Sequence, residues 1–167
     1  MLEFELLIKN NFSKLSKDMF AILADNMSNI APTGNTYDGD YKIWHEAVGE
    51  GLKKEERNIV LIYISNILAG FFQYYTDNEL FMMEEIQIAP DYQGKKYNIF
   101  RSLFGYIFSV LPPEIDTVEA YANKKNIKSQ EILRHLGLHV IGENKSGSSY
   151  HYQGYFENLI EWHCHGK

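Results

Sequence analysis

The sequence predicts an α+β fold in one domain that spans residues 1–167. A chain of 167 residues can enclose one hydrophobic core, and no repeat, low-complexity tract or linker divides it. Hydrophobic residues make up 45% of the sequence and charged residues 23%, as in ordinary globular proteins. Three consecutive strand patterns stand between segments of helical periodicity, and this order favours a sheet flanked by helices.

The N-terminal part is predicted to hold one short strand and two helices. The strand covers residues 4–8, and the first helix covers residues 12–27 because apolar residues recur there at helical spacing. A loop starts at Pro32, and the second helix is expected over residues 41–53. The apolar faces of the two helices contain Leu15, Met19, Ile22, Leu23, Tyr41, Trp44 and Val48.

Three strands are predicted next, arranged as a meander over residues 58–64, 67–75 and 80–89. The turns between them are expected at Ser65-Asn66 and at residues 76–78, because Ser, Asn and Asp form local hydrogen bonds that favour turns.

The loop of residues 93–98, Gln-Gly-Lys-Lys-Tyr-Asn, is the most informative segment of the chain. It opens a helix over residues 99–111, which Pro112 and Pro113 end. Backbone N–H groups at a helix start are unpaired donors at the positive end of the helix dipole. Two lysines beside such donors favour a phosphate, so the loop predicts a site for a phosphorylated cofactor.

The C-terminal part is predicted to contain a strand over residues 117–122 and a helix that begins at Asn126. Gly137 suits the C′ position after that helix, since glycine adopts the left-handed conformation without a Cβ penalty. Two further strands are expected over residues 138–142 and 150–160.

Residues 126–138 resemble a signature of the GCN5-related N-acetyltransferases (GNAT), Asn-x-x-Ala-x-x-Leu-Tyr-x-Lys-x-Gly-Phe. The positions in register are Asn126, Ser129, Ile132, Leu133, His135, Gly137 and Leu138. The earlier loop resembles the family's acetyl-CoA loop, Gln/Arg-x-x-Gly-x-Gly/Ala, with Gln93 in first place. The resemblance covers about residues 2–162 and implies a GNAT-like fold around a mixed, mostly antiparallel central sheet.

Three residues depart from the family pattern. Lys96 and Asn98 stand where the loop normally has Gly and then Gly or Ala. Lysine can still bind phosphate through its charge, and asparagine tolerates unusual backbone dihedrals. Leu133 stands where the family commonly has a Tyr that protonates the leaving thiolate, and leucine has no proton to give. Binding of CoA is therefore better supported than the usual acid step.

The resemblance also implies which residues form the site. General bases of the family often precede the first loop residue by nine or eleven places, and Glu84 is nine places before Gln93. Strand alternation puts Glu84 on one face with Ile86, and Glu85 is the reserve because a β-bulge would reverse the alternation. Acetyl-CoA is the implied cofactor, and backbone N–H groups near Ile86 and Ile88 would hold its pantetheine. The residues implied in cofactor binding are Ile86, Ile88, Gln93, Gly94, Lys95, Lys96, Tyr97, Asn98, Asn126 and Ser129.

Charge and composition exclude several classes of partner. A net charge of −6 and a pI near 5.5 argue against nucleic acid as the acceptor. No apolar run approaches the ~20 residues that a membrane span requires, and the N-terminus has no signal-peptide pattern. One cysteine, Cys164, agrees with a cytoplasmic location. The His163-Cys164-His165 tail is expected to be disordered and to bind no metal, and a homodimer is compatible with the sequence.

We therefore expect a cytoplasmic, acetyl-CoA-dependent N-acetyltransferase, in which a primary amine of a small molecule or peptide attacks the thioester directly. In the resembled family the second helix and the loop before it line the acceptor pocket. The aromatic residues at those places are Tyr37, Tyr41, Trp44 and His45. Aromatic rings there could hold an amine, although Tyr41 and Trp44 at helical spacing also suit a core. Two alternatives stay open: a sensor or interaction module that binds CoA without turnover, and a structural domain without CoA affinity.

Overall fold

The computed structural model describes residues 1–166 as an α+β fold with a seven-stranded sheet. The strands are β1 (Leu2–Leu6), β2 (Arg57–Ile64), β3 (Ile67–Asp77), β4 (Leu80–Ile88), β5 (Thr117–Asn123), β6 (His139–Glu143) and β7 (Ser149–Tyr155). The α-helices are α1 (Phe12–Met27), α2 (Tyr37–Gly51), α3 (Ile99–Val110), α4 (Ile127–His135) and α5 (Phe156–His165).

The strand order in the sheet is β1-β2-β3-β4-β5-β7-β6. The β4–β5 pair is parallel, whereas β1–β2, β5–β7 and β6–β7 are antiparallel. The predicted α+β class with a mixed, mostly antiparallel sheet flanked by helices is therefore confirmed. The chain forms two compact units, one of Met1–Tyr74 with Glu85–Ile99 and the other of Tyr75–Glu84 with the residues from Phe100 on. A single-domain organisation stays a prediction.

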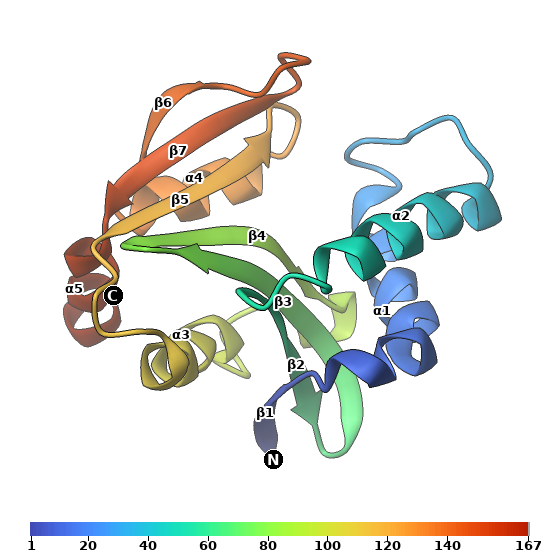
Figure 1. The fold of residues 1–167 in the computed structure, drawn as a ribbon, viewed down its shortest axis with the longest axis horizontal. Coiled ribbons are helices and arrows are strands. Elements are labelled where there is room, and N and C mark those ends of the chain that lie inside the picture. Colours follow the sequence, from blue (N-terminus) through green and yellow to red (C-terminus); the bar gives the residue numbers. More distant parts are fainter. Residues whose placement is uncertain (167) are drawn as a thin grey trace. The chain divides into compact units, whose positions relative to one another are not determined.

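The first unit has its core between α1, α2 and the strands β2 and β3. Figure 1 shows α1 and α2, in blue and teal, side by side. Met19 of α1, Ile59 of β2 and Phe71 of β3 are almost completely buried in one apolar cluster, which Val48 of α2 joins. Trp44 packs against the same cluster. The apolar spacing of both helices thus forms a core.

The helix boundaries in this unit follow local signals. α1 covers the predicted residues 12–27, whereas α2 begins at Tyr37, four residues before the predicted start. The side chain of Thr36 caps α2 by accepting a hydrogen bond from the N–H of Gly39 at 3.0 Å, which explains the earlier start. The first strand ends at Leu6 rather than at residue 8, because a 3₁₀ turn follows at Lys9.

The β3–β4 hairpin contains one residue more in its second arm than in its first. Asn78 and Glu79 form a two-residue turn, so Asp77 lies opposite Leu80. Further along, the N–H of Ala89 donates to the carbonyl of Ala69 at 2.8 Å. Ala89 lies nine residues after Leu80, whereas Ala69 lies only eight residues before Asp77. The second arm therefore contains a β-bulge, which reverses the alternation of side chains beyond it.

The second unit contains a long antiparallel ladder between β5 and β7, from Thr117–Tyr155 to Asn123–Ser149. The helix α4 lies against β5 (Figure 1). The parallel ladder between β4 and β5 is short, running from Leu80–Thr117 to Met83–Ala120.

The C-terminus differs from the prediction. The last strand ends at Tyr155 rather than at residue 160, and α5 follows it directly. The rings of Phe104 in α3 and Trp162 in α5 lie 5.5 Å apart, and Leu159 is fully buried. Apolar residues at helical spacing therefore pack the segment as a helix, so the expected disordered tail is wrong up to His165, where α5 ends. None of the helices described is long and apolar enough to cross a membrane.

Candidate functional site

The loop of residues 93–98 has the backbone of a tight, solvent-exposed turn directly before α3. Gly94 and Asn98 both adopt positive φ angles, 102° and 49°. Asparagine adopts this left-handed conformation more readily than most residues other than glycine, so Asn98 replaces a glycine without breaking the turn. Lys95 and Lys96 are exposed, and the ammonium of Lys96 lies 5.1 Å from the ring centroid of Tyr97.

Gln93 ties this loop to the rest of its unit. Its Nε2 donates to Oδ1 of Asn26 at 3.0 Å and to the carbonyl of Ile88 at 2.9 Å. Nδ2 of Asn26, near the end of α1, donates to the same carbonyl at 2.9 Å and to Oε1 of Gln87 at 2.9 Å. These bonds hold the start of the loop against α1 and the end of β4. Gln93 thus positions the loop backbone.

The two predicted carboxylates fall in different units, Glu85 in the first and Glu84 in the second. Oε2 of Glu85 lies 3.4 Å from Nε1 of Trp44 on α2, and its Oε1 lies 3.4 Å from Nε2 of Gln87. The ring of Trp44 also contacts that of Phe71 on β3, with centroids 6.1 Å apart.

These contacts locate the β-bulge. Trp44 touches both Phe71 and Glu85, so these two side chains lie on the same face of the hairpin. Without an extra residue, the register of the turn would pair Phe71 with Ile86, and Glu85 would point to the other face. The extra residue therefore precedes Glu85. Glu84 is half-buried and lies before this point or within it.

Ser16, Tyr41 and His45 form a chain of polar side chains near α2, to which the sequence analysis had not connected Ser16. The buried hydroxyl of Ser16 lies 2.8 Å from the hydroxyl of Tyr41, which lies 3.4 Å from Nδ1 of His45. The imidazole of His45 stacks on Phe12, with centroids 5.1 Å apart. The only sequence signal for this chain is the spacing of Tyr41 and His45 by one helical turn.

In the second unit, Asn126 caps α4. Its Oδ1 accepts a hydrogen bond from the N–H of Ser129 at 3.1 Å, so the first and fourth places of the family signature form a helix N-cap. At the other end, the N–H of Leu138 donates to the carbonyl of Leu133 at 3.0 Å, and Gly137 has a φ of 88°. This is a Schellman motif, which confirms Gly137 at C′. The side chain of Leu133 is only 8% exposed.

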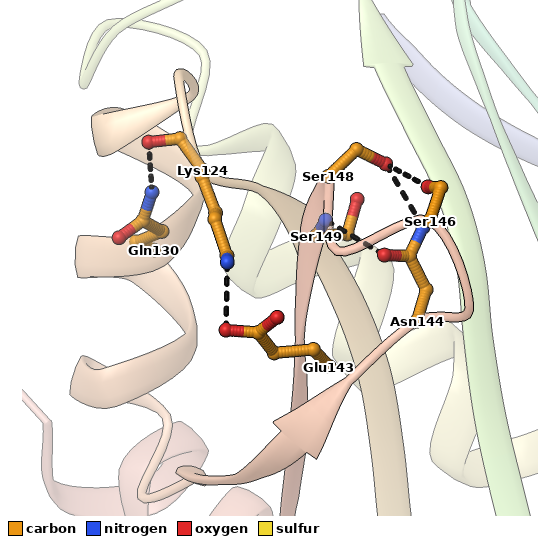
Figure 2. A network of polar contacts seen from close by, with 7 residues as sticks. All are labelled: Lys124, Gln130, Glu143, Asn144, Ser146, Ser148 and Ser149. Atoms are coloured by element: carbon orange, nitrogen blue, oxygen red, sulfur yellow. Dashed lines mark hydrogen bonds and ion pairs between the residues drawn. The ribbon is translucent and has the colours of Figure 1, made fainter.

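Lys124, which precedes α4, takes part in a polar network that holds the β6–β7 turn (Figure 2). Its ammonium lies 2.6 Å from Oε1 of Glu143 and 5.0 Å from the ring centroid of Tyr150. Nε2 of Gln130 donates to the carbonyl of Lys124 at 2.9 Å. The β6–β7 turn itself is held by side-chain hydrogen bonds among Asn144, Ser146, Ser148 and Ser149. The charge of Lys124 is thus neutralised within this unit.

The residues of the loop fit the phosphates of CoA. A Cβ at Gly94 would meet no other atom within 4 Å, so the backbone there is open to a ligand. The two exposed lysines supply positive charge at the start of α3, where the helix dipole favours an anion. Among residues 1–166, no three His, Cys, Asp or Glu side chains gather as metal ligands would.

No protein-family model matches the sequence, and no curated protein matches it. Solved structures match over almost its whole length. An acetyltransferase from Thermus thermophilus is 13% identical with a TM-score of 0.71, covering 93% of this chain and 97% of that one. The PaiA N-acetyltransferase from Thermoplasma acidophilum, solved in complex with coenzyme A, is 12% identical with a TM-score of 0.71, covering 93% and 99%.

A third structure, a Desulfovibrio desulfuricans chain described as a GNAT-family acetyltransferase, is 12% identical with a TM-score of 0.70, covering 93% of this chain and 99% of that one. Identities this low show the fold alone. All three neighbours are named acetyltransferases, and the chain described here has the fold of the GNAT acetyltransferases.

Proposed function

We propose that the protein is a CoA-dependent N-acetyltransferase that acts on a primary amine of a small molecule or peptide. The observation that carries the proposal is the exposed, lysine-bearing loop before α3, with Gly94 and Asn98 at positive φ, in a chain with the acetyltransferase fold. Bound acetyl-CoA would supply the acetyl group as an activated thioester.

The loop would bind the pyrophosphate through its backbone N–H groups and through Lys95 and Lys96. Gln93 would keep the loop in position through Asn26 and the carbonyl of Ile88. We further propose that backbone groups of Ile86 and Ile88 hold the pantetheine. Tyr97, Asn126 and Ser129 complete the proposed cofactor-binding set, and the helix dipole of α4 supports the last two.

For the base we propose the carboxylate pair on β4, and the β-bulge favours Glu85 over Glu84. The carboxylate of Glu85 is half-buried beside the indole N–H of Trp44, and its negative charge would attract an ammonium group. Glu85 would accept the proton of that ammonium, which frees the amine to attack. Glu84 is the alternative base.

Leu133 supplies no proton to the leaving thiolate. A thiol has a pKa of ~8.5, so the thiolate can leave without prior protonation and turnover does not require an acid at this position. The apolar, buried Leu133 also favours the second candidate function, a CoA-binding sensor or interaction module without turnover.

The two functions are separated by measuring ligand binding and thiol release on the same protein. CoA or acetyl-CoA should raise Tm. At a hundredfold excess of ligand over Kd, the unfolding free energy should increase by ~2.7 kcal/mol. Lys96→Glu should weaken this effect because it places an anion against the phosphates, whereas exposed Lys145 on the β6–β7 turn offers a matched control as Lys145→Glu.

A panel of amines should then release free thiol from acetyl-CoA. If CoA binds but no amine is acetylated, the sensor function replaces the enzyme; if neither ligand shifts Tm, both candidates fail. We also propose a cytoplasmic location, supported by the single cysteine, and a homodimer, which a size measurement in solution would test.

A further inference from the structure

A chain of amide side chains connects the loop of residues 93–98 with the carboxylate of Glu85. Nε2 of Gln93 donates to Oδ1 of Asn26 at 3.0 Å, and Nδ2 of Asn26 donates to Oε1 of Gln87 at 2.9 Å. Nε2 of Gln87 in turn donates to Oε1 of Glu85 at 3.4 Å. The three amides, here called the amide chain, belong together with Glu85 to the first compact unit.

The direction of these hydrogen bonds is fixed by the backbone carbonyl of Ile88. A carbonyl oxygen only accepts hydrogen bonds, and Asn26 and Gln93 each place an amide atom 2.9 Å from it, so both of these atoms are nitrogens. The oxygen of the Asn26 amide therefore faces Gln93, and its second N–H points to Gln87. The nitrogen of Gln87 then faces the carboxylate of Glu85, which only accepts when it is ionised. Every donor in the amide chain thus points from the loop towards Glu85.

The strand β4 holds the end of the amide chain that contacts Glu85. Glu85 and Gln87 are two residues apart and both lie beyond the β-bulge, so their side chains share one face of β4. The side chain of Gln87 is only 9% exposed. A Cβ at Gly70 of β3 would clash with the carbonyl oxygen of Gln87, so the two backbones approach each other closely there. The backbone of Gln87 therefore has little freedom, and its amide can orient the carboxylate.

Asn26 joins the two ends of the amide chain. It lies in the last turn of α1, and its hydrogen bonds to Gln93, Gln87 and the carbonyl of Ile88 are 2.9 or 3.0 Å long. The bond from Gln87 to Glu85 is longer, at 3.4 Å, and therefore weaker. Hydrogen bonds in a chain polarise one another, so a charge bound beside Gln93 changes the strength of this last bond.

We propose that Asn26 is a positioning residue that holds the loop of residues 93–98 and the carboxylate of Glu85 in one hydrogen-bonded chain. Phosphates of CoA bound at the loop then alter the bond that orients Glu85 towards the ammonium group of the acceptor. Asn26 acts through Gln93 and Gln87 in this role. This inference rests on the proposed acetyltransferase function and adds to it a connection between cofactor binding and the base.

Two substitutions separate the ends of the amide chain. Gln87→Met keeps about the length of the side chain and removes the amide beside Glu85, while the bonds of Asn26 to Gln93 and Ile88 remain. It should lower kcat for thiol release by about threefold to tenfold, as for loss of one ordinary hydrogen bond, and leave Kd for CoA unchanged. Gln93→Met should instead raise Kd for CoA by a similar factor. A merely structural role of these amides would change Tm alone.

Asn26→Leu tests the residue that joins both ends. It should raise Kd for CoA and lower kcat together, and Gln87→Met should lower kcat less in this background than in the wild type. Asn58→Ala is the matched control, since Asn58 is also half-buried in the first unit and donates to a backbone carbonyl, that of Glu56. It should change neither kcat nor Kd. If Asn26→Leu does not fold, as its Tm shows, the variants at Gln87 and Gln93 still decide.

A second measurement needs no turnover. Nε1 of Trp44 lies 3.4 Å from Oε2 of Glu85, so the resonance of the indole N–H reports on that carboxylate. The resonance is identified by its loss in Trp44→Phe. It should shift when saturating CoA is added to the wild type, and the shift should be much smaller in Gln87→Met.

The outcomes separate this inference from the proposed function. If the indole shift depends on Gln87 while no amine is acetylated, the amide chain stands and the proposed enzyme fails. If an amine is acetylated but Gln87→Met keeps the kcat of the wild type, the amides only satisfy one another and the inference is refuted. An indole shift that is absent, or equal in the wild type and Gln87→Met, refutes it as well. If CoA does not raise the Tm of the wild type, the proposed function and the inference fail together.

Discussion

Replacement of Glu85 by glutamine should separate its chemical role from its structural one. The change keeps the shape of the side chain and removes the group that could accept a proton. The contacts of the carboxylate with Nε1 of Trp44 and with Nε2 of Gln87 are each 3.4 Å long, so these two are weak hydrogen bonds. Their loss should cost at most ~1 kcal/mol of unfolding free energy.

The catalytic effect should be larger than the structural one. Loss of a general base lowers turnover by ~10²–10⁴, which corresponds to about 3–5 kcal/mol in the activation free energy. The assay measures kcat and KM for thiol release across pH, together with Tm and the stabilisation by CoA. We expect kcat to collapse at neutral pH while CoA binding and Tm stay near the wild-type values.

Glu84→Gln is the matched control, because it changes the neighbouring residue by the same atoms. If the bulge precedes Glu85, Glu84→Gln should be the milder variant. A collapse of kcat in Glu84→Gln with near-normal activity in Glu85→Gln would refute the register argument and make Glu84 the base. Equal activity in both variants and the wild type would exclude a base on β4.

Three further predictions concern other parts of the molecule. Leu133→Tyr should leave the rate of thiol release unchanged or raise it across the pH range. Its Tm should fall, because a larger and polar side chain enters a buried position. If activity is lost while CoA binding is intact, Leu133 instead shapes the acceptor pocket. Asn126→Ala removes the N-cap of α4 and should cost ~1 kcal/mol in unfolding free energy by denaturant titration, whereas an unchanged midpoint would show that the cap contributes nothing. Hydrogen bonds lower the pKa of Asp40 below its ordinary value of 3.8, the larger effect coming from Thr33 and the smaller from Asn35. The ionised carboxylate therefore stabilises the fold above pH 3.8, and this contribution is lost as the pH falls through the lowered pKa. Melting curves of wild type and Asp40→Asn should therefore differ most at neutral pH and converge in acid; a constant difference would contradict the linkage.

Local patterns in the sequence were sufficient for most elements of the fold. The spacing of apolar residues predicted α1 over the residues that the structure shows, since one buried stripe decides a helix. Ser65 and Asn66 both have positive φ angles, as a two-residue hairpin turn requires. Gly137 ends α4 where the glycine predicted it. A helix began earlier than predicted where an N-cap residue precedes the apolar pattern, as Thr36 does at the start of α2.

The arrangement of the site depended on contacts between residues far apart in the chain. Strand alternation predicts the face on which a side chain lies only while the ladder is regular. The extra residue in β4 is revealed only by the pairing of β4 with β3, through the hydrogen bond between Ala89 and Ala69. Gln93 matched the family loop, but its bonds to Asn26 and Ile88 could not be read from that match. The strand predicted up to residue 160 became α5 from Phe156 because packing against α3 favoured a helix there.

The sequence by itself determined the order of the elements, the lysine-bearing loop before α3 and the leucine at position 133, because each of these depends on residues adjacent in the chain. Only the tertiary structure decided which carboxylate touches Trp44 and that Asn26 of α1 joins Gln87 to Gln93. The physical reason is that strand register and side-chain burial are set by pairing between distant segments. A side chain acquires its charge environment only when that pairing forms.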